Sequence, residues 1–319
     1  MAKNYVVGVD VGGQTSKIGI VNEKGEVIVQ SVIRSDTYGT DAEAFIKALA
    51  EAIKALIAEA GLEGQIRGIG CGAPNGNHYN GTISFAPNLA WASNGTVEFT
   101  KLLSSNLEGI PVDLTNDANA AAVGEMTYGA ARGMKNFIMI TLGTGVGSGI
   151  VIDGKLVYGH DGFAGELGHV TIERDGRLCG CGRKGCLEAY CSATGVARTV
   201  KEWLAKSDEP TLLRNYENAS AKDVFDCAKQ GDKMAKEIFD YTGTLLGRAL
   251  ADFIAFSAPE AIVLFGGLAR NKEFLTDSIL KAMNDNVLPL WKNKVKLVYT
   301  ELNASDAAIL GASALAWEL

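Results

Sequence analysis

Four residues in the segment ELGHVTIERDGRLCGCGRKGCLEAY (166–190) have the types and spacing of a metal site: His169, Cys179, Cys181 and Cys186. One imidazole and three thiolates form the ligand set of a closed tetrahedral Zn²⁺ site. A Cys-x-Cys pair does not readily close a strain-free disulfide, and the glycines at 180, 182 and 185 let the backbone turn tightly around an ion. We predict structural zinc here, the alternative being a reduced loop that holds no metal.

Carboxylates form a second group of candidates. Glu166 and Glu188 flank the cysteine cluster, and Asp117 stands between an expected strand and an expected helix in TNDANAAAVGE. A carboxylate at such a junction can accept a proton from a substrate hydroxyl. The alternative is that Asp117 caps the helix, a role for which Asn116 is equally suited.

Two glycine turns, DVGGQTS (10–16) and LGTGVGSG (142–149), could present backbone N–H groups and hydroxyls to phosphates. Neither fits the pattern G-x-x-x-x-G-K-[ST], which excludes a P-loop. Each turn alone is also compatible with a tight β-turn that binds nothing. Taken as a pair, with Asp10 at a strand end where it could hold Mg²⁺, the turns favour a phosphate-rich ligand.

The elements that must position these residues alternate between strand and helix. YVVGVDV, SKIGIVN and VIVQSVI predict three strands, and residues 41–61 predict a helix with apolar residues at helical spacing that stops at Gly61. Strands at 66–72 and 111–116 follow, and a second helix is expected to begin at Asp117.

The order then repeats in NFIMITLGTGVGSGIVIDGKLVYG. A shift of 130 residues pairs Gly13 with Gly143, Gly19 with Gly149, Ile20 with Ile150 and Val21 with Val151. Two related α/β halves with facing glycine turns would form a cleft between them. The remainder predicts helices at roughly 187–206, 221–258 and 271–285, strands at AIVLFGG and VKLVYT, and a last helix near Asp306.

Composition limits the classes of function. With 319 residues and 47% hydrophobic content, the chain can bury two ordinary cores. Lys plus Arg number 30 against 37 acidic residues, a net charge of −7, with no basic cluster beyond Arg183-Lys184, so we expect no nucleic-acid partner. The N-terminus lacks a signal-peptide pattern, and the apolar stretch 137–152 is short and glycine-broken, so we expect a cytoplasmic protein without a membrane partner.

Together these motifs resemble the ROK family of sugar kinases and repressors, within the actin-like ATPase superfamily. The resemblance covers nearly the whole chain and rests on LGTGVGSGIVIDGKLVYGHDGFAGELGH, TNDANAA, the PNLAW loop (87–91) and the spacing His-x9-Cys-x-Cys-x4-Cys followed by LEAY. It implies an α/β fold of two actin-like (ribonuclease H-like) domains with an interdomain cleft and a structural zinc loop. Residues 1–117 plus 305–319 would form the small domain and residues 118–304 the large one.

The resemblance also implies roles. Asp117 would be the catalytic base, and sugar hydroxyls would be held by Asn88, Asn116, Glu166, His169 and Glu188. His169 would bind zinc through one ring nitrogen and face the sugar with the other. ATP with Mg²⁺ would contact Asp10, Gly12, Gly13, Gln14, Thr15, Gly143, Thr144 and Gly145, and the adenosine would lie beside Gly266 and Gly267, unless FGG is a plain strand-to-helix turn.

We therefore expect an ATP-dependent hexose kinase, foremost a glucokinase acting on the 6-hydroxyl, with a homodimer as the family's common assembly. Alternatives within the class are kinases of N-acetylmannosamine, N-acetylglucosamine, mannose or fructose. A sugar-responsive repressor is the rival from another class, disfavoured because the first strand begins by Tyr5 with no helix-turn-helix ahead of it. The sequence departs from the family at Gln14 and Thr15, and in GAPNGNHYNGTI, where a Pro-Gly-Pro loop is commoner.

Overall fold

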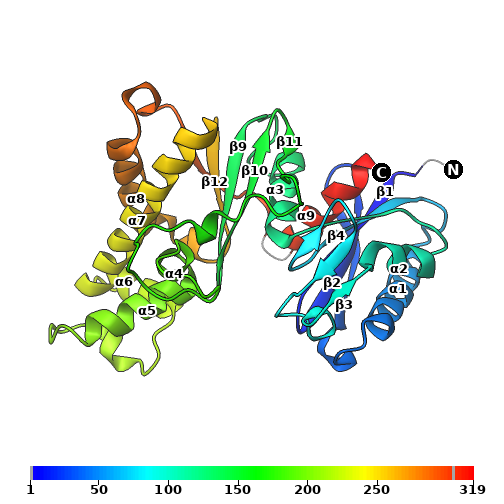
Figure 1. The fold of residues 1–319 in the computed structure, drawn as a ribbon, viewed down its shortest axis with the longest axis horizontal. Helices are drawn as coiled ribbons and strands as arrows, with labels where there is room; N and C mark the ends of the chain where they lie inside the picture. The colour runs from blue at the N-terminus through cyan, green and yellow to red at the C-terminus, as the bar shows by residue number, and fades with distance from the viewer. Residues whose placement is uncertain (1–2, 304–305) are drawn as a thin grey trace.

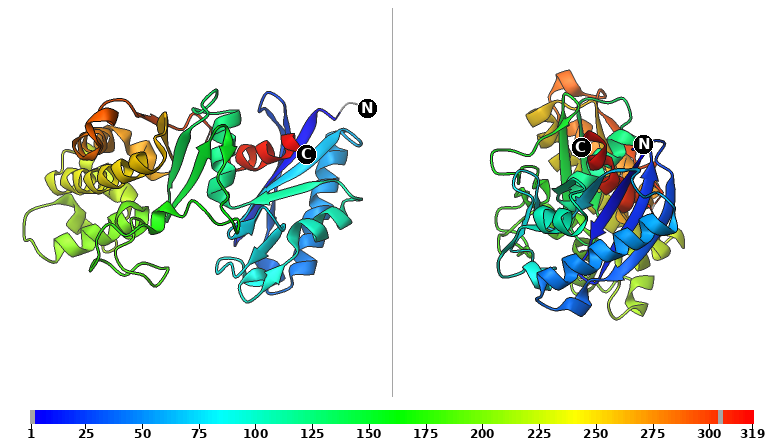
Figure 2. Two further views of the ribbon diagram at one scale, coloured as in Figure 1. Left: turned by 45° about the horizontal axis from the view of Figure 1, so that its top comes forward. Right: turned by 90° about the vertical axis from the view of Figure 1, so that its right-hand side faces the viewer.

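The structure is a computed structural model that describes residues 3–303 and 306–319. It has two lobes, each built around one five-stranded sheet (Figure 1). Strands β1 to β4 lie in one lobe with helices α1 and α2, and strands β9 to β12 lie in the other with helices α4 to α8 (Figures 1 and 2). Both chain ends lie in the first lobe (Figure 2).

The first sheet has the strand order β3-β2-β1-β4-β8. Its strands are β1 (Tyr5–Val11), β2 (Thr15–Asn22), β3 (Val27–Arg34), β4 (Ile66–Gly72) and β8 (Val112–Thr115). Helix α1 (Ala42–Glu59) begins after Asp41, whose side chain accepts a hydrogen bond from Ala44 N, and its buried face includes Phe45, Leu49 and Ile53. The predicted helix and the strand at 66–72 are confirmed, because both follow from local apolar patterning and caps.

The second sheet repeats that order as β11-β10-β9-β12-β13. Its strands are β9 (Phe137–Leu142), β10 (Val146–Ile152), β11 (Lys155–Leu156), β12 (Ala261–Phe265) and β13 (Lys296–Tyr299). In both sheets the first two pairings are antiparallel and the last two are parallel. The predicted duplication is confirmed. The second glycine turn is one residue shorter, since Leu142 pairs with Val146 while Val11 pairs with Ser16.

Helices α3 (Asp117–Thr127) and α9 (Ala307–Leu315) join the lobes and pack against each other. Their contact is close enough to need glycine: a Cβ on Gly124 would lie 2.7 Å from Gly311 Cα. Helix α9 covers β1 and β4 of the first sheet, while α3 also contacts β9 and β10 of the second. The domain division at residue 117 stays a prediction, and the predicted return between 304 and 305 lies outside the described residues.

The second lobe is completed by α4 (Glu188–Cys191), α5 (Ala193–Leu204), α6 (Ala221–Lys229), α7 (Lys233–Ser257) and α8 (Lys272–Asn286). The stretch predicted as helical at 221–258 is helical but divided into α6 and α7: Gly231 adopts a φ of +92°, and Asp232 caps α7 by accepting from Ala235 N. The helix predicted at 187–206 is also two helices, because Ser192 caps α5. Both breaks depend on a single capping side chain inside an apolar pattern that continues across it.

A small sheet that sequence patterning missed extends from the first lobe. It consists of β5 (Gly76–Asn77), β6 (Thr82–Ser84) and β7 (Thr96–Val97), and it leads into α2 (Phe99–Asn106). Among the described residues, no helix has the length and apolar character needed to cross a membrane.

Candidate functional site

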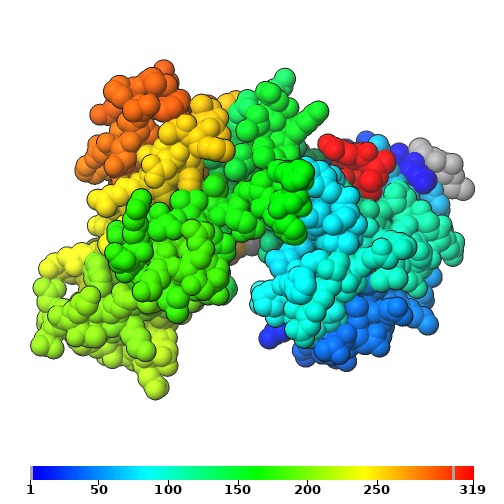
Figure 3. All heavy atoms as spheres, in the orientation of Figure 1, coloured from blue at the N-terminus to red at the C-terminus, as the bar shows by residue number. Residues whose placement is uncertain are grey.

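A polar cavity of about 490 Å³ contains every residue that the sequence predicted for base and sugar contacts. A hollow separates the two lobes on the face shown in Figure 3. The cavity is lined by the first lobe's 74–88 region, the start of α3, the β9–β10 turn and the segment approaching the cysteine cluster. The predicted residues in it are Asn88, Asn116, Asp117, Gly143, Thr144, Gly145, Glu166, His169 and Glu188.

Asp117 is the first residue of α3, and the cap of that helix is Asn116, whose side chain accepts from Asn119 N at 2.6 Å. The capping role is therefore taken, and the Asp117 carboxylate is left facing the cavity, where it is accessible to solvent. The surrounding walls desolvate it and raise its pKa, against a hydrogen bond from Ala118 N that lowers it. A carboxylate that a substrate can contact, and whose pKa is raised, can accept a proton from a bound hydroxyl.

A second, smaller cavity of about 240 Å³ adjoins the first and shares Asp117, Thr141 and Gly143 with it. Asp10 lies in this cavity, as does Gly266 at the end of β12. Burial raises the pKa of Asp10, and the charge of Asp117 raises it further, while Lys17 acts in the opposite direction. A buried carboxylate whose ionisation is disfavoured by a second carboxylate fits a site where a divalent cation would neutralise the charge.

The two glycine turns differ in their relation to the cavities. The β9–β10 turn contributes Gly143, Thr144 and Gly145 to the larger cavity. Predicted phosphate and adenosine contacts outside both cavity linings are Gly12, Gly13, Gln14, Thr15 and Gly267. Glycine is nevertheless required at position 13, because a Cβ there would collide with the carbonyl oxygen of Asn88. The first turn thus abuts the loop that carries a predicted sugar contact.

The PNLAW loop is held by its apolar residues. Leu89 is fully buried, and Trp91 stacks on Phe45 of α1 with ring centroids 4.8 Å apart. Asn88 directly precedes these buried residues, and its backbone carbonyl abuts Gly13. Its side chain remains exposed at the cavity. Burial of its neighbours therefore orients the one polar side chain of the loop that lines the site.

Glu166 is positioned by β10. Ser148 of that strand donates through its hydroxyl to Gly165 O and accepts from Leu167 N, so it holds both neighbours of Glu166. Burial raises the pKa of Glu166, His169 lowers it, and the charges of Asp117 and Glu188 raise it again. Ser148 was not predicted as functional, since nothing local marks it.

The four predicted zinc ligands come together. Their ligand atoms all lie within 4.8 Å of one another, with Cys179 Sγ 3.7 Å from His169 Nδ1 and Cys181 Sγ 3.7 Å from Cys186 Sγ. Bonds of about 2.3 Å from Zn²⁺ to sulfur imply tetrahedral edges of about 3.8 Å, so the residues fit such an ion. His169 uses Nδ1 toward the cluster, which leaves Nε2 for the cavity. All six cysteines are free thiols.

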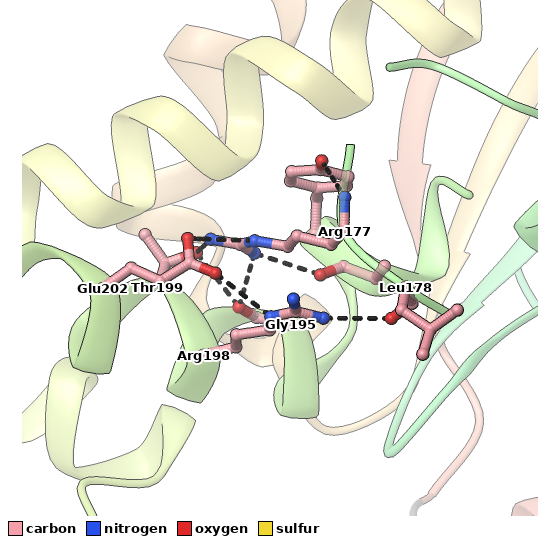
Figure 4. A network of polar contacts seen from close by, with 8 residues as sticks. Arg177, Leu178, Gly195, Arg198, Thr199 and Glu202 are labelled. Atoms are coloured by element: carbon pink, nitrogen blue, oxygen red, sulfur yellow. Dashed lines mark hydrogen bonds and ion pairs between the residues drawn. The ribbon is translucent and has the colours of Figure 1, made fainter. Parts of the chain in front are cut away.

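Arg177, two residues before the first cysteine, ties the cysteine loop to α4 and α5 (Figure 4). Its guanidinium donates to Ala189 O, Gly195 O and Thr199 Oγ1, and pairs with Glu202 at 2.6 Å. It also lies 4.5 Å from the centre of the Tyr190 ring. The side chain of Arg177 is only 6% exposed. This buried network fixes the position of α4, which begins at Glu188.

The duplicated sheets and the polar cleft between them define the class of protein as an actin-like ATPase fold with a sugar-kinase type of site. The ROK family profile matches residues 6–318, and the chain belongs to this family. It is 37% identical to a glucokinase of Thermotoga maritima, over 99% of this chain and 98% of that one.

Two solved structures resemble it over almost their whole length. A ROK hexokinase from Thermus thermophilus has a TM-score of 0.83 at 30% identity, covering 98% of both chains. A ROK family glucokinase from Streptomyces griseus, solved in complex with glucose and AMPPNP, has a TM-score of 0.78 at 32% identity, covering 99% of this chain and 100% of that one.

Proposed function

We propose that this protein is an ATP-dependent hexose kinase that transfers the γ-phosphoryl group to the 6-hydroxyl of glucose. The observation that carries the proposal is the 490 Å³ cavity, where Asp117, an accessible carboxylate of raised pKa, stands among five polar side chains of the types that bind sugar hydroxyls. The full-length similarity to two glucokinases, one of them with glucose and an ATP analogue in its structure, supports the choice of substrates.

In this proposal Asp117 accepts the proton of the attacking hydroxyl. Asn88, Asn116 and Glu188 hold the other hydroxyls, together with Glu166 and His169, so that the reactive oxygen is oriented before transfer. Gly143, Thr144 and Gly145 offer the donors of the β9–β10 turn to the phosphates, beside the cavity that holds Asp10. The first glycine turn (12–15) and Gly266–Gly267 complete the nucleotide contacts.

We propose that the protein binds two metal ions. Mg²⁺, held near Asp10, would neutralise phosphate charge during transfer. Zn²⁺, held by His169, Cys179, Cys181 and Cys186, would have a structural role. The cysteine loop then presents His169 and Glu188 to the sugar, while Asp117 serves the proton transfer. We further propose a homodimer, which light scattering coupled to size exclusion tests directly.

The function is tested by a coupled assay with ATP across glucose, mannose, fructose, N-acetylglucosamine and N-acetylmannosamine. We expect glucose to exceed both acetylated sugars by at least about tenfold in kcat/KM, a difference of about 1.4 kcal/mol in transition-state binding. Several charged acceptors select for hydroxyl donors, and an analogue lacking one leaves an unpaired polar group. If the protein prefers an acetylated sugar, the assignment of glucose as substrate is wrong. If it phosphorylates none of the five sugars, the proposed hexose kinase activity is refuted.

A further inference from the structure

The segment Asn77-His78-Tyr79 of the first lobe contacts residues 158–161 of the second lobe, and we call this set of contacts the grip. Asn77 Nδ2 donates to Asp161 O at 2.6 Å, and Tyr79 OH donates to Gly159 O at 2.7 Å. Between them, the His78 ring stacks on Tyr158 with centroids 4.2 Å apart and planes 5° from parallel. Three consecutive residues therefore make three contacts across the lobes, in the part of the chain that departs from the family pattern.

Two of these three residues also form hydrogen bonds within the first lobe that fix their positions. His78 Nδ1 is 2.8 Å from Asp113 of β8. Asn77 is 3% exposed, and its Oδ1 accepts from Tyr79 N at 3.0 Å, so the same side chain shapes its own turn and reaches the other lobe. The hairpin that carries these residues also places Pro74 and Asn75 in the sugar cavity.

The gripped segment leads directly into the opposite wall of that cavity. Residues 158–164 form a closed turn in which Ala164 N donates to Tyr158 O and Phe163 N donates to the Asp161 side chain. Phe163 and Glu166 line the cavity a few residues on. Gly162 adopts a φ of +91°, and a Cβ there would lie 2.6 Å from Asn77 Nδ2, so the approach depends on that glycine.

We propose that Asn77, His78 and Tyr79 are positioning residues that hold the Phe163–Glu166 wall in its sugar-binding place. This rests on the proposed function, since it assigns these residues to the sugar side of that site. Without the grip, binding a sugar must also order the wall, and that entropy cost weakens sugar binding. The β9–β10 turn makes none of these contacts, so ATP binding is left unchanged.

Two variants separate this role from folding. Asn77→Asp keeps the oxygen that shapes the turn but sets a carboxylate against Asp161 O. Tyr79→Phe removes only the hydrogen bond to Gly159 O, at a residue that is 59% exposed, so the substitution leaves no cavity in the core. Asn80→Asp is the matched control: it makes the same chemical change three residues along, where Asn80 Oδ1 accepts only within the hairpin, from Thr82.

We expect the KM for glucose to rise at least about tenfold in Asn77→Asp and about threefold or more in Tyr79→Phe, with the KM for ATP within twofold of wild type. Amide hydrogen exchange of residues 158–166, measured without sugar or nucleotide, should quicken in both variants and stay unchanged in Asn80→Asp. A glucose KM within twofold in both variants, a parallel rise in both KM values, or unchanged exchange overturns the proposal. Failure of the wild type to phosphorylate any sugar would refute the kinase instead, and the exchange result would still decide whether the grip exists.

Discussion

Glu188 Oε2 accepts a hydrogen bond from Val146 N at 3.0 Å, which joins the carboxylate beside the cysteine cluster to the β9–β10 turn. Gly145 lies so close that a Cβ there would collide with this oxygen. One side chain thus faces the proposed sugar and also holds the turn that faces the phosphates.

Two substitutions of Glu188 should separate these tasks. Gln retains an oxygen for Val146 N but loses the charge, so the KM for glucose should rise about tenfold or more while that for ATP stays within twofold. Ala loses both contacts, so both KM values should rise. Steady-state kinetics with each substrate varied decides this; an Ala variant affecting glucose alone would separate Glu188 from the turn.

Asp117→Asn preserves shape and removes the proton acceptor. We expect kcat to fall at least about 100-fold, with the Kd for glucose little changed in calorimetry. Asp208→Asn, at an exposed aspartate after α5, is the matched control and should retain full turnover. Near-normal kcat in Asp117→Asn would remove this residue from the mechanism.

Metal analysis of protein purified without added metal should find about one zinc per chain, because the four clustered residues would supply the ligands of a single tetrahedral site. Cys181→Ser should lose zinc and weaken glucose binding. Cys227→Ala, at a buried cysteine outside the cluster, should keep zinc. A fully active wild type free of metal is the outcome that contradicts the site.

The two arginines that pair with Glu202 should differ in their effect on stability. Arg177→Ala removes a buried guanidinium that donates to Ala189 O and Gly195 O and pairs with Glu202, and it should lower the free energy of unfolding by about 3 kcal/mol. Arg198→Ala removes a side chain that is 42% exposed, and should cost about 1 kcal/mol or less. Denaturant unfolding measures both; equal losses would show that the buried network adds nothing.

The contact of His78 with Asp113 predicts a pH-dependent stability. The hydrogen bond to Asp113 raises the pKa of His78, against partial burial that lowers it. The other titratable groups around the ring are Tyr79, Tyr158, Glu318 and Lys155. A raised folded-state pKa means that the stabilisation is complete below the unfolded value of about 6.5 and is lost as pH rises through the folded value. The unfolding midpoint of wild type should therefore exceed that of His78→Gln by more at pH 5.5 than at pH 9. A difference that does not change with pH would contradict the pairing.

The sequence alone determined the elements whose signals are local. The bounds of α1, of β4 and of the start of α3 follow from apolar spacing and capping residues, and the repeated strand order follows from two similar stretches. The cysteine cluster could also be predicted from the sequence, because its four residues lie within 18 positions of one another. These features depend on neighbours along the chain, so a linear pattern is enough to reveal them.

Only the tertiary structure decided how distant segments meet. Thr141, Phe163 and Pro74 line the cavities without any motif to mark them, and Ser148 and Arg177 act through backbone groups far from their own positions. The contact between Asn77 and Asp161 spans 84 residues. No local propensity encodes such a pairing, because it arises when two separately folded sheets are brought together by α3 and α9 and their surface loops come into hydrogen-bonding distance.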